Sequence, residues 1–393
     1  MNRARTNLAA LGSVLVLLLN SGCGEDASDL RSVLWAFHLN DSTTFKLRGT
    51  YHREHLEFFN GPETLHASIL GTDSFSLPPF NGLITGHWNA GQFEGQWTDG
   101  LRNDYRVRLT ATETRDAASE LEEDVPWKHW DAFMPGNDST PFGTLMLQVT
   151  HDRIQGTIAT PTGDFRHLHG APLSNGSWEF GTFDGAHLYH LRTWPAKNGL
   201  FGTFHSGNHY ASTFRADLRA HAPKTAPLEA PLRDSIPFEA HAYNRDGERL
   251  IWTAETLPGE ITVIDIMGTW CPNCLDEIRL LKRLAATHPN VAFMSVAFER
   301  GADEQPERAW QRIEQYRNEL KVEWPMYLGG PANKQKAGDA FPFLERVASF
   351  PTTVFVHRDG RIITHSGFNG PATGAAHQAE IAAFEHNIQS LLN

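Results

Sequence analysis

The sequence predicts two successive fold classes, an all-β N-terminal region and an α/β C-terminal domain. Between residues 30 and 220, short segments of alternating polarity are separated by glycine-rich turns. From residue 237 to 393, continuous apolar runs alternate with segments whose apolar residues have helical spacing. Residues 221–236, "HAPKTAPLEAPLRDSI", are typical of a linker or of an irregular edge, because they contain three prolines and few large apolar side chains.

Length and charge narrow the class of protein. At 393 residues the chain is long enough for two or three domains, and its 40% hydrophobic content is typical of a soluble globular protein. The net charge of −12 disfavours nucleic acid as a partner, because there is no basic surplus to neutralise phosphates. The absence of a phosphate-binding loop and of a dinucleotide fingerprint disfavours a nicotinamide-dependent enzyme.

Residues 1–22 are predicted to be an export signal, with a basic head, a short apolar run and small residues before Cys23. The run is shorter than the roughly 20 apolar residues of a membrane-spanning helix. The ending Ser-Gly-Cys resembles the lipobox of lipoprotein signals, although Asn20 stands where that motif usually has leucine. This resemblance implies lipidation of Cys23 and anchoring to a bacterial envelope membrane on its periplasmic side. An ordinary cleaved signal is the alternative.

The region 30–220 is predicted to be antiparallel β structure, either a sandwich or a barrel. Segments such as residues 44–52, 105–111 and 212–220 show the period-two polarity of half-buried strands. Similar strings recur in one order, which predicts two repeats of about 105 residues. The pairs are "KLRGTY" from Lys46 with "RIQGTI" from Arg153 and "EGQWTDG" from Glu94 with "FGTFHSG" from Phe201, both at an offset of 107, and "FNGLITGHW" from Phe80 with "FDGAHLYHL" from Phe183, at an offset of 103.

The C-terminal part is predicted to form a sheet flanked by helices. Residues 261–268 and 290–299 are apolar runs rich in β-branched side chains, which suits strands buried on both faces. Residues 275–287 between them have helical spacing, as do residues 376–392 at the end. The predicted order is strand, helix, strand, helix, hairpin and final helix. The stretch "TTVFVHRDGRIITHSG" predicts a hairpin that turns at its Asp-Gly pair.

The motif "TWCPNC" contains Cys271 and Cys274 where the first predicted strand meets a helix. A helix N-terminus stabilises an anion, so a thiol there loses its proton more readily, and Pro272 suits the first helical turn. If Cys23 is lipidated, no third cysteine remains for these two. Zinc is disfavoured because no second cysteine pair exists, and a structural staple because so small a loop stabilises little. We therefore expect a redox-active pair and no other cofactor or metal.

Residues 237–393 resemble the thioredoxin fold, and especially the TlpA- and ResA-like bacterial thiol:disulfide oxidoreductases. The resemblance rests on Asp265, on Trp270 and the dithiol that follows it, and on "FPTT" at 350–353. The N-terminal segments "GTIATPTGDFRHLHG", "FDGAHLYH" and "FGTFHSGNH" are similar to the region that accompanies this domain in a subgroup of exported TlpA-like proteins. The resemblance implies a thioredoxin-like central mixed sheet flanked by helices.

The resemblance also implies a role for each motif residue. Cys271 would be the nucleophile and Cys274 the resolving thiol. Pro351 would be the cis-proline that faces the dithiol, or alternatively the start of an edge strand. Asp265 would be the buried acid that exchanges protons with Cys274, and Glu277 a second acid near the thiols, with an exposed helix residue as the alternative.

These observations predict an envelope thiol:disulfide oxidoreductase that acts as a reductant rather than as an oxidant. Its partners would be protein disulfides and an upstream membrane or periplasmic thiol reductant. The intervening Pro272-Asn273 pair departs from that of many relatives and leaves the direction of electron flow open.

Two alternatives have features of their own. A peroxiredoxin-like peroxidase is disfavoured, since Ile264 occupies the position where its motif has proline. A lipid-tethered binding module would use the aromatic and histidine-rich loops of the β region for a ligand or partner. The histidines of these loops are weak candidates for metal ligands: His167, His169, His187, His190, His205 and His209.

Overall fold

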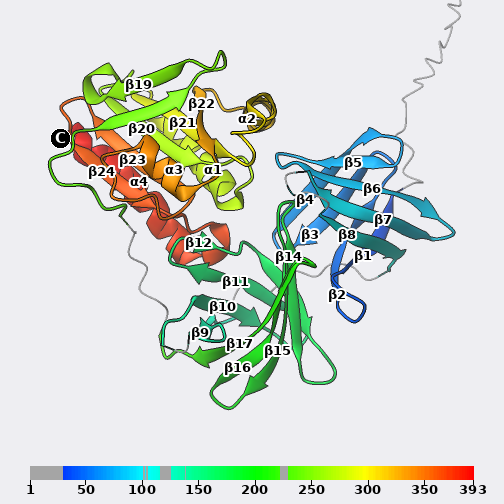
Figure 1. Cartoon of the computed structure of the whole chain (residues 1–393). Helices are drawn as coiled ribbons and strands as arrows, with labels where there is room; N and C mark the ends of the chain where they lie inside the picture. Colours follow the sequence, from blue (N-terminus) through cyan, green and yellow to red (C-terminus); the bar gives the residue numbers. More distant parts are fainter. Residues whose placement is uncertain (1–29, 101, 103–104, 116–124, 138, 222–228) are drawn as a thin grey trace, which may run out of the picture.

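The computed structural model describes residues 30–100, 102, 105–115, 125–137, 139–221 and 229–393. The predicted signal at 1–22 and Cys23 lie outside these residues, and the predicted linker is described only at its ends. The described chain forms three sheets, coloured blue, green and yellow to red along the sequence in Figure 1. None of the helices in the described ranges is long and apolar enough to span a membrane.

The first sheet is a closed antiparallel barrel in which each strand pairs with the next and β1 pairs with β8. We call it barrel 1. Alternate residues of each strand point inward, so that Trp35, Phe37 and Phe58 fill the interior and are fully buried. Its strands are β1 (Arg31–His38), β2 (Thr44–Tyr51), β3 (His55–Asn60), β4 (Glu63–Gly71), β5 (Ser74–Leu77), β6 (Gly82–Asn89), β7 (Gln92–Asp99) and β8 (Arg106–Glu113).

The second sheet is antiparallel as well, and pairing of β10 with β11 closes eight of its nine strands into a ring. We call it barrel 2. The short strand β12 pairs only with the end of β11, and it carries the chain toward the third sheet. The strands are β9 (Lys128–Phe133), β10 (Gly143–Val149), β11 (Ile154–Thr160), β12 (Gly163–Asp164), β13 (Leu168–Pro172), β14 (Trp178–Phe183), β15 (Leu188–Ala196), β16 (Gly199–Ser206) and β17 (Tyr210–Leu218).

The N-terminal region is thus all-β, and its two sheets are barrels rather than a sandwich. Both barrels run as meanders in chain order. The strands are counted here around each eight-stranded ring, which leaves out β12. The strings from Glu94 and Phe201 then lie on the seventh strand of each barrel, and those from Phe80 and Phe183 reach into the sixth. The strings from Lys46 and Arg153 lie on non-equivalent strands, the second and the third. Two of the three matches are therefore topologically equivalent, and the duplication itself stays a prediction.

Barrel 2 closes one end of barrel 1 with Phe183. Its ring packs among the buried aromatic rings of barrel 1, 4.5 Å from that of Phe37 and 5.0 Å from that of Trp97 between centroids. Asn60 of barrel 1 is fully buried beside it, donates to the Phe183 carbonyl oxygen at 2.7 Å and accepts from the Phe183 N–H at 3.1 Å. The two barrels therefore share part of one core.

The third sheet has the order β19-β18-β22-β21-β20-β23-β24, with β20, β21 and β22 parallel. Its central strands bury both faces: Val263 packs with α1, α2 and α4, whereas Ile264 packs with α3 and residues 341–347. The elements are β18 (Glu239–Tyr243), β19 (Arg249–Thr253), β20 (Ile261–Met267), α1 (Pro272–Thr287), β21 (Val291–Glu299), α2 (Pro306–Leu320), β22 (Met326–Pro331), α3 (Lys334–Ala340), β23 (Thr352–His357), β24 (Ile362–Ser366) and α4 (Ala375–Leu392), with short 3-10 turns at Ala254–Thr256 and Pro371–Thr373.

The predicted strands, helices and hairpin of this region are all present, whereas β18, β19, β22 and α3 were not predicted from the sequence. The end of the predicted linker also differs from an exposed connector. Ala230 is buried, its carbonyl oxygen accepts from the Thr364 hydroxyl at 2.8 Å, and Leu232 forms an isolated bridge with Leu344. Ala230 therefore packs against the third sheet and Leu232 pairs with the segment at Leu344, while residues 232–236 are exposed.

Candidate active site

Cys271 and Cys274 form a disulfide at the junction of β20 and α1, with their Cα atoms 5.2 Å apart. Cys271 is the N-cap residue of α1, and its sulfur accepts from the backbone N–H of Cys274 at 3.2 Å. Pro272 occupies the first helical turn, where a missing N–H costs nothing. Cys274 is fully buried and Cys271 is 6% exposed, so Cys271 is the more accessible sulfur.

Pro351 follows a cis peptide bond and lies next to the disulfide. The Cys271 sulfur is 3.5 Å from the carbonyl oxygen of Phe350, the residue before the proline. The alternative of an edge-strand start is wrong, because β23, which begins at the next residue, pairs with β20 on one side and β24 on the other. The proline loop is thus held against the sulfur by a central strand.

The side chain of Trp270 covers the turn before Cys271. Its indole N–H donates to the Phe298 carbonyl oxygen at 2.9 Å, and its ring meets that of Phe350 edge to face at 5.7 Å. The Arg300 guanidinium lies 4.8 Å from the ring centroid. Trp270 therefore links the dithiol turn to the proline loop.

Two fully buried carboxyl groups lie on the elements that carry the dithiol, Asp265 on β20 and Glu277 on α1. The Ser295 hydroxyl donates to Asp265 Oδ2 at 3.2 Å, and Thr353 donates to Glu277 Oε1. Within the described ranges, Asp265 Oδ1 and Glu277 Oε2 have no partner. The exposed-residue alternative for Glu277 is therefore wrong.

Burial raises the pKa of Asp265 to about 8. Burial and the neighbouring charge of Asp265 also raise the pKa of Glu277 well above its ordinary value. Each carboxyl thus favours the protonated form near neutral pH, and Asp265 changes its protonation state at about pH 8.

A third buried acid, Glu299, supports the dithiol turn and was missed from the sequence. It is at the end of β21, where it accepts from the backbone N–H and the hydroxyl of Thr269, both at 2.8 Å, while Arg312 Nε lies 3.3 Å away. A glutamate that ends an apolar strand has no distinctive sequence pattern. Only the folded chain shows that Glu299 holds Thr269, two positions before Cys271, through these hydrogen bonds.

Barrel 2 contacts the same turn through Arg166, which is 4% exposed. The Arg166 guanidinium lies 2.7 Å from Asp276 Oδ2, donates to the Pro272 carbonyl oxygen at 3.1 Å and forms an ion pair with Glu63 of barrel 1. Arg279 also lies 2.9 Å from Asp276 Oδ1, but its side chain is half exposed. One buried cation therefore joins both barrels to α1.

The intervening residue Asn273 is paired with barrel 2 as well. In the amide orientation that satisfies both groups, it donates to the Asp164 carbonyl oxygen at 3.2 Å and accepts from the Asp164 N–H at 3.1 Å. Gly163 has a φ of +148°, and a Cβ there would lie 1.9 Å from an end atom of the Asn273 amide group, so the approach requires glycine. Segment 162–166 therefore lies against the dithiol motif.

Asp164 is buried at this contact, and the Gly370 N–H donates to its carboxylate. Burial and the charge of Asp276 raise the pKa of Asp164 to about 7. Asp164 and Arg166 belong to the string "GDFRHLHG", whose histidines and aromatic residues drew attention in the sequence. Its charged residues did not, because their side chains have partners more than 100 positions away, such as Asp276 for Arg166 and Gly370 for Asp164.

The histidines of the β region are distributed over several environments. His190 lies 2.9 Å from Glu179 and His187 3.3 Å from Asp184, whereas burial lowers the pKa of His167 and, together with Arg153 and Arg48, that of His169. In the part of the chain that the structure describes, no three His, Cys, Asp or Glu side chains are grouped to hold a metal ion.

A mixed sheet flanked by helices, with a dithiol between its first central strand and a helix, defines a thioredoxin-like domain. No protein-family model and no curated protein matches the sequence. Among solved structures, the chain is similar to a thioredoxin-like protein from Aeropyrum pernix, with 15% identity over 38% of this chain and 88% of that one, at a TM-score of 0.28.

Two further solved structures are similar in the same range. One is a putative thiol:disulfide interchange protein DsbE from Chlorobium tepidum, with 16% identity over 43% of this chain and 100% of that one, at a TM-score of 0.29. The other is StoA from Bacillus subtilis, with 18% identity over 36% of this chain and 96% of that one, at a TM-score of 0.25. Each similarity covers less than half of this chain.

The raised pKa of Asp265 predicts a pH-dependent stability. With a pKa of about 8 in the folded chain against an ordinary 3.8, the folded state binds more protons between these pH values, so its stability falls as pH rises through them. Asp265→Asn should raise the free energy of unfolding by more than about 1 kcal/mol at pH 9 and by less at pH 4. Urea unfolding of the oxidised protein at both pH values measures this.

The matched control is Asp303→Asn, which removes an exposed carboxylate from the same domain. It should change the free energy of unfolding little at either pH. An equal effect of Asp265→Asn at pH 4 and pH 9 would contradict the predicted linkage.

Removal of the Arg166 charge should destabilise the chain, since it leaves the buried Asp276 without its closest cation. We expect Arg166→Gln to lower the free energy of unfolding by about 3 kcal/mol. Arg215→Gln removes the same charge from an exposed ion pair on barrel 2 and should cost less than about 1 kcal/mol. Tryptophan fluorescence in urea measures the unfolding transition of both variants. Identical unfolding midpoints for the two would show that the buried Arg166 stabilises the fold no more than the exposed Arg215 does.

Proposed function

We propose that the protein is a thiol:disulfide oxidoreductase that reduces disulfides of exported proteins. The observation that carries the proposal is the position of Cys271 at the N-terminus of α1, with the cis-Pro351 loop beside its sulfur. This arrangement supports a thiolate at Cys271, because the helix N-terminus and the Cys274 N–H both favour negative charge there.

In the proposed reaction, the reduced Cys271 thiolate attacks one sulfur of a substrate disulfide. A mixed disulfide forms, the substrate bond breaks, and the other substrate sulfur leaves as a thiolate. The Cys274 thiolate then attacks the Cys271 sulfur, which closes the Cys271–Cys274 disulfide and releases the second substrate thiolate. Two electrons pass from the dithiol to the substrate, and a thiol reductant upstream must return them.

The proton of the buried Cys274 needs an acceptor before this second attack. Asp265 suits the role, since a group whose pKa is about 8 exchanges protons near neutral pH. Glu277, one turn after Cys274 on α1 and hydrogen-bonded to Thr353, is a second candidate for holding that proton. The cis-proline loop would align an extended substrate segment through the backbone of Phe350.

The proposed location is the periplasmic side of a bacterial envelope, with a lipid on Cys23. This part of the proposal rests on the sequence of residues 1–23. A tethered reductant would meet disulfides of exported proteins there, because that compartment is oxidising.

The order of attack predicts which cysteine can be trapped. Cys274→Ser should accumulate a mixed disulfide between Cys271 and a disulfide-containing peptide, because the resolving thiol is gone. Intact-mass spectrometry detects the adduct. The double variant Cys271→Ser/Cys274→Ser is the control and should give none. The proposed roles of the two cysteines would be contradicted if Cys274→Ser gave no adduct while Cys271→Ser gave one.

The proposed direction predicts a low reduction potential. We expect the Cys271–Cys274 couple to equilibrate with glutathione at a potential below about −230 mV, in the range of cytosolic reductants rather than of periplasmic oxidants. Equilibration at fixed ratios of reduced to oxidised glutathione, read by thiol alkylation, gives the value. A potential near about −120 mV would instead assign the protein to oxidants.

A further inference from the structure

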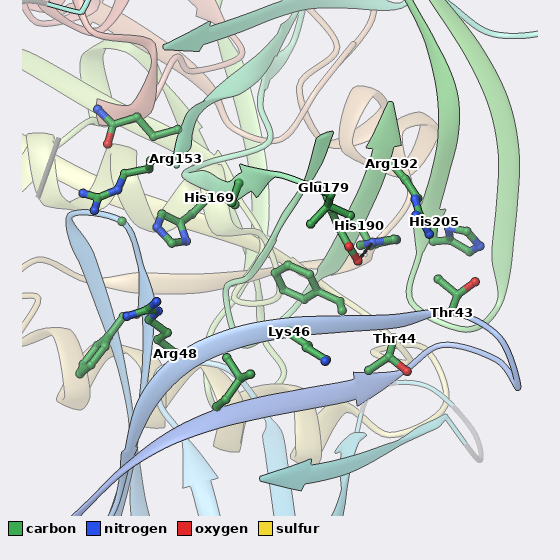
Figure 2. A pocket seen from close by; sticks show the side chains of 18 of the residues that line it. Thr43, Thr44, Lys46, Arg48, Arg153, His169, Glu179, His190, Arg192 and His205 are labelled. Atoms are coloured by element: carbon green, nitrogen blue, oxygen red, sulfur yellow. Dashed lines mark hydrogen bonds and ion pairs between the residues drawn. The ribbon is translucent and has the colours of Figure 1, made fainter. Parts of the chain in front are cut away.

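Barrels 1 and 2 enclose a cleft of about 1200 Å³ on the side of barrel 2 that faces β2. One wall is the outer face of β2 with the turn that precedes it and the turn between β3 and β4, and the other is formed by β13 to β16 with the start of β11 (Figure 2). This volume is at or above the upper end of the range of small-molecule sites, roughly 300–1000 Å³. None of the dithiol residues lines the cleft.

The cleft is positively charged in a protein whose net charge is −12. Its lining contains four cationic side chains against two carboxylates, Asp152 and Glu179. Of these carboxylates, Asp152 is exposed at the cleft and Glu179 is paired with His190 at 2.9 Å. A cavity of this sign in an acidic protein favours an anionic ligand. The cations are Lys46 and Arg48 on β2, Arg153 before β11 and Arg192 on β15.

The charges are divided between two ends of the cleft. Figure 2 shows Arg48, Arg153 and His169 together at one end, and burial and the charges of these two arginines lower the pKa of His169 to about 4. At the other end lie Arg192, His190 and His205. There the rings of His190 and His205 are 5.6 Å apart.

The second end also has buried polar atoms without partners. On β15, Leu191 points into barrel 2, so the neighbouring His190 and Arg192 point outward. Barrel 1 covers His190, of which only 2% is exposed. Among the described residues, nothing hydrogen-bonds to His190 Nδ1, Arg192 Nε or His205 Nδ1. Buried donors and acceptors are normally satisfied, so this end of the cleft has unused hydrogen-bonding capacity beside the charge of Arg192.

We propose that this cleft binds an elongated small-molecule polyanion whose acidic groups, carboxylate or phosphate, contact Arg48 and Arg153 at one end and Arg192 at the other. Threonine hydroxyls at positions 43, 44 and 203 line the cleft and offer further hydrogen bonds. This binding activity goes beyond thiol–disulfide exchange, and it does not depend on the state of Cys271 and Cys274.

The test is binding of two polyanions to the oxidised full chain by isothermal titration calorimetry. Tripolyphosphate and citrate are the probes, with sodium chloride at matched ionic strength as the reference. We expect at least one probe to bind saturably. Binding of tripolyphosphate alone assigns phosphate groups to the ligand, and binding of citrate alone assigns carboxylates. If neither binds, the proposal is wrong.

Single substitutions locate the bound probe. Arg153→Gln and Arg192→Gln, one at each end, should each raise the Kd about tenfold, because each removes a charge-assisted hydrogen bond. Lys46→Gln alters an exposed residue of the cleft, so it tests the site without risk to folding. Arg215→Gln removes the same charge from barrel 2 outside the cleft and should leave the Kd unchanged. Equal weakening by Arg215→Gln would show a general charge effect and overturn the site.

The titration of His169 gives an independent readout. A bound anion between Arg48 and Arg153 offsets their positive field, so the His169 pKa should rise by about one pH unit or more from its value near 4. NMR titration of the histidine ring with and without saturating probe measures it. An unchanged pKa in the saturated protein would place the anion elsewhere.

Discussion

The buried guanidinium of Arg166 is the interaction on which the arrangement of the chain depends. A charge that has lost its water must be paired on several sides, and here the partners come from different parts of the molecule. Barrel 1 contributes Glu63, helix α1 contributes Asp276, and the first turn of α1 contributes the Pro272 carbonyl oxygen. Displacement of any one part would leave a buried charge incompletely paired, so this charge fixes how the three sheets are arranged relative to one another.

This relation brings the β region into the environment of the dithiol. The two residues between the cysteines both contact barrel 2, Pro272 through Arg166 and Asn273 through the backbone of Asp164. In the proposed reaction the Cys271–Cys274 pair would respond to the hydrogen bonds and charges around it, so the contacts with barrel 2 would help to set its redox properties. The same stretch of chain then enters β13, where His169 lines the cationic cleft. The two sites are neighbours along one short segment.

Much of the fold follows from local patterns, and the omissions have physical causes. Continuous apolar runs identify β20 and β21 because strands covered on both faces need apolar side chains throughout. Strand β22 contains two adjacent glycines, and helix α3 has seven mostly small or polar residues, so neither has a periodic pattern. The string at Arg153 resembled a non-equivalent strand because short Gly-containing strings of alternating polarity look alike. The burial of Ala230 depends on β24, more than 130 positions away.

The sequence by itself determined the disulfide pair, because two cysteines on the first turn of a helix must lie within disulfide reach. It also indicated Asp265, Glu277 and the proline loop, through spacing and resemblance. Tertiary structure alone decided that Glu277 is buried against Thr353 and that Asn273 pairs with Asp164. It likewise assembled a cationic cleft from two barrels. The reason is the same for each: burial, and charge brought together from distant segments, depends on which surfaces pack, and no local pattern records that.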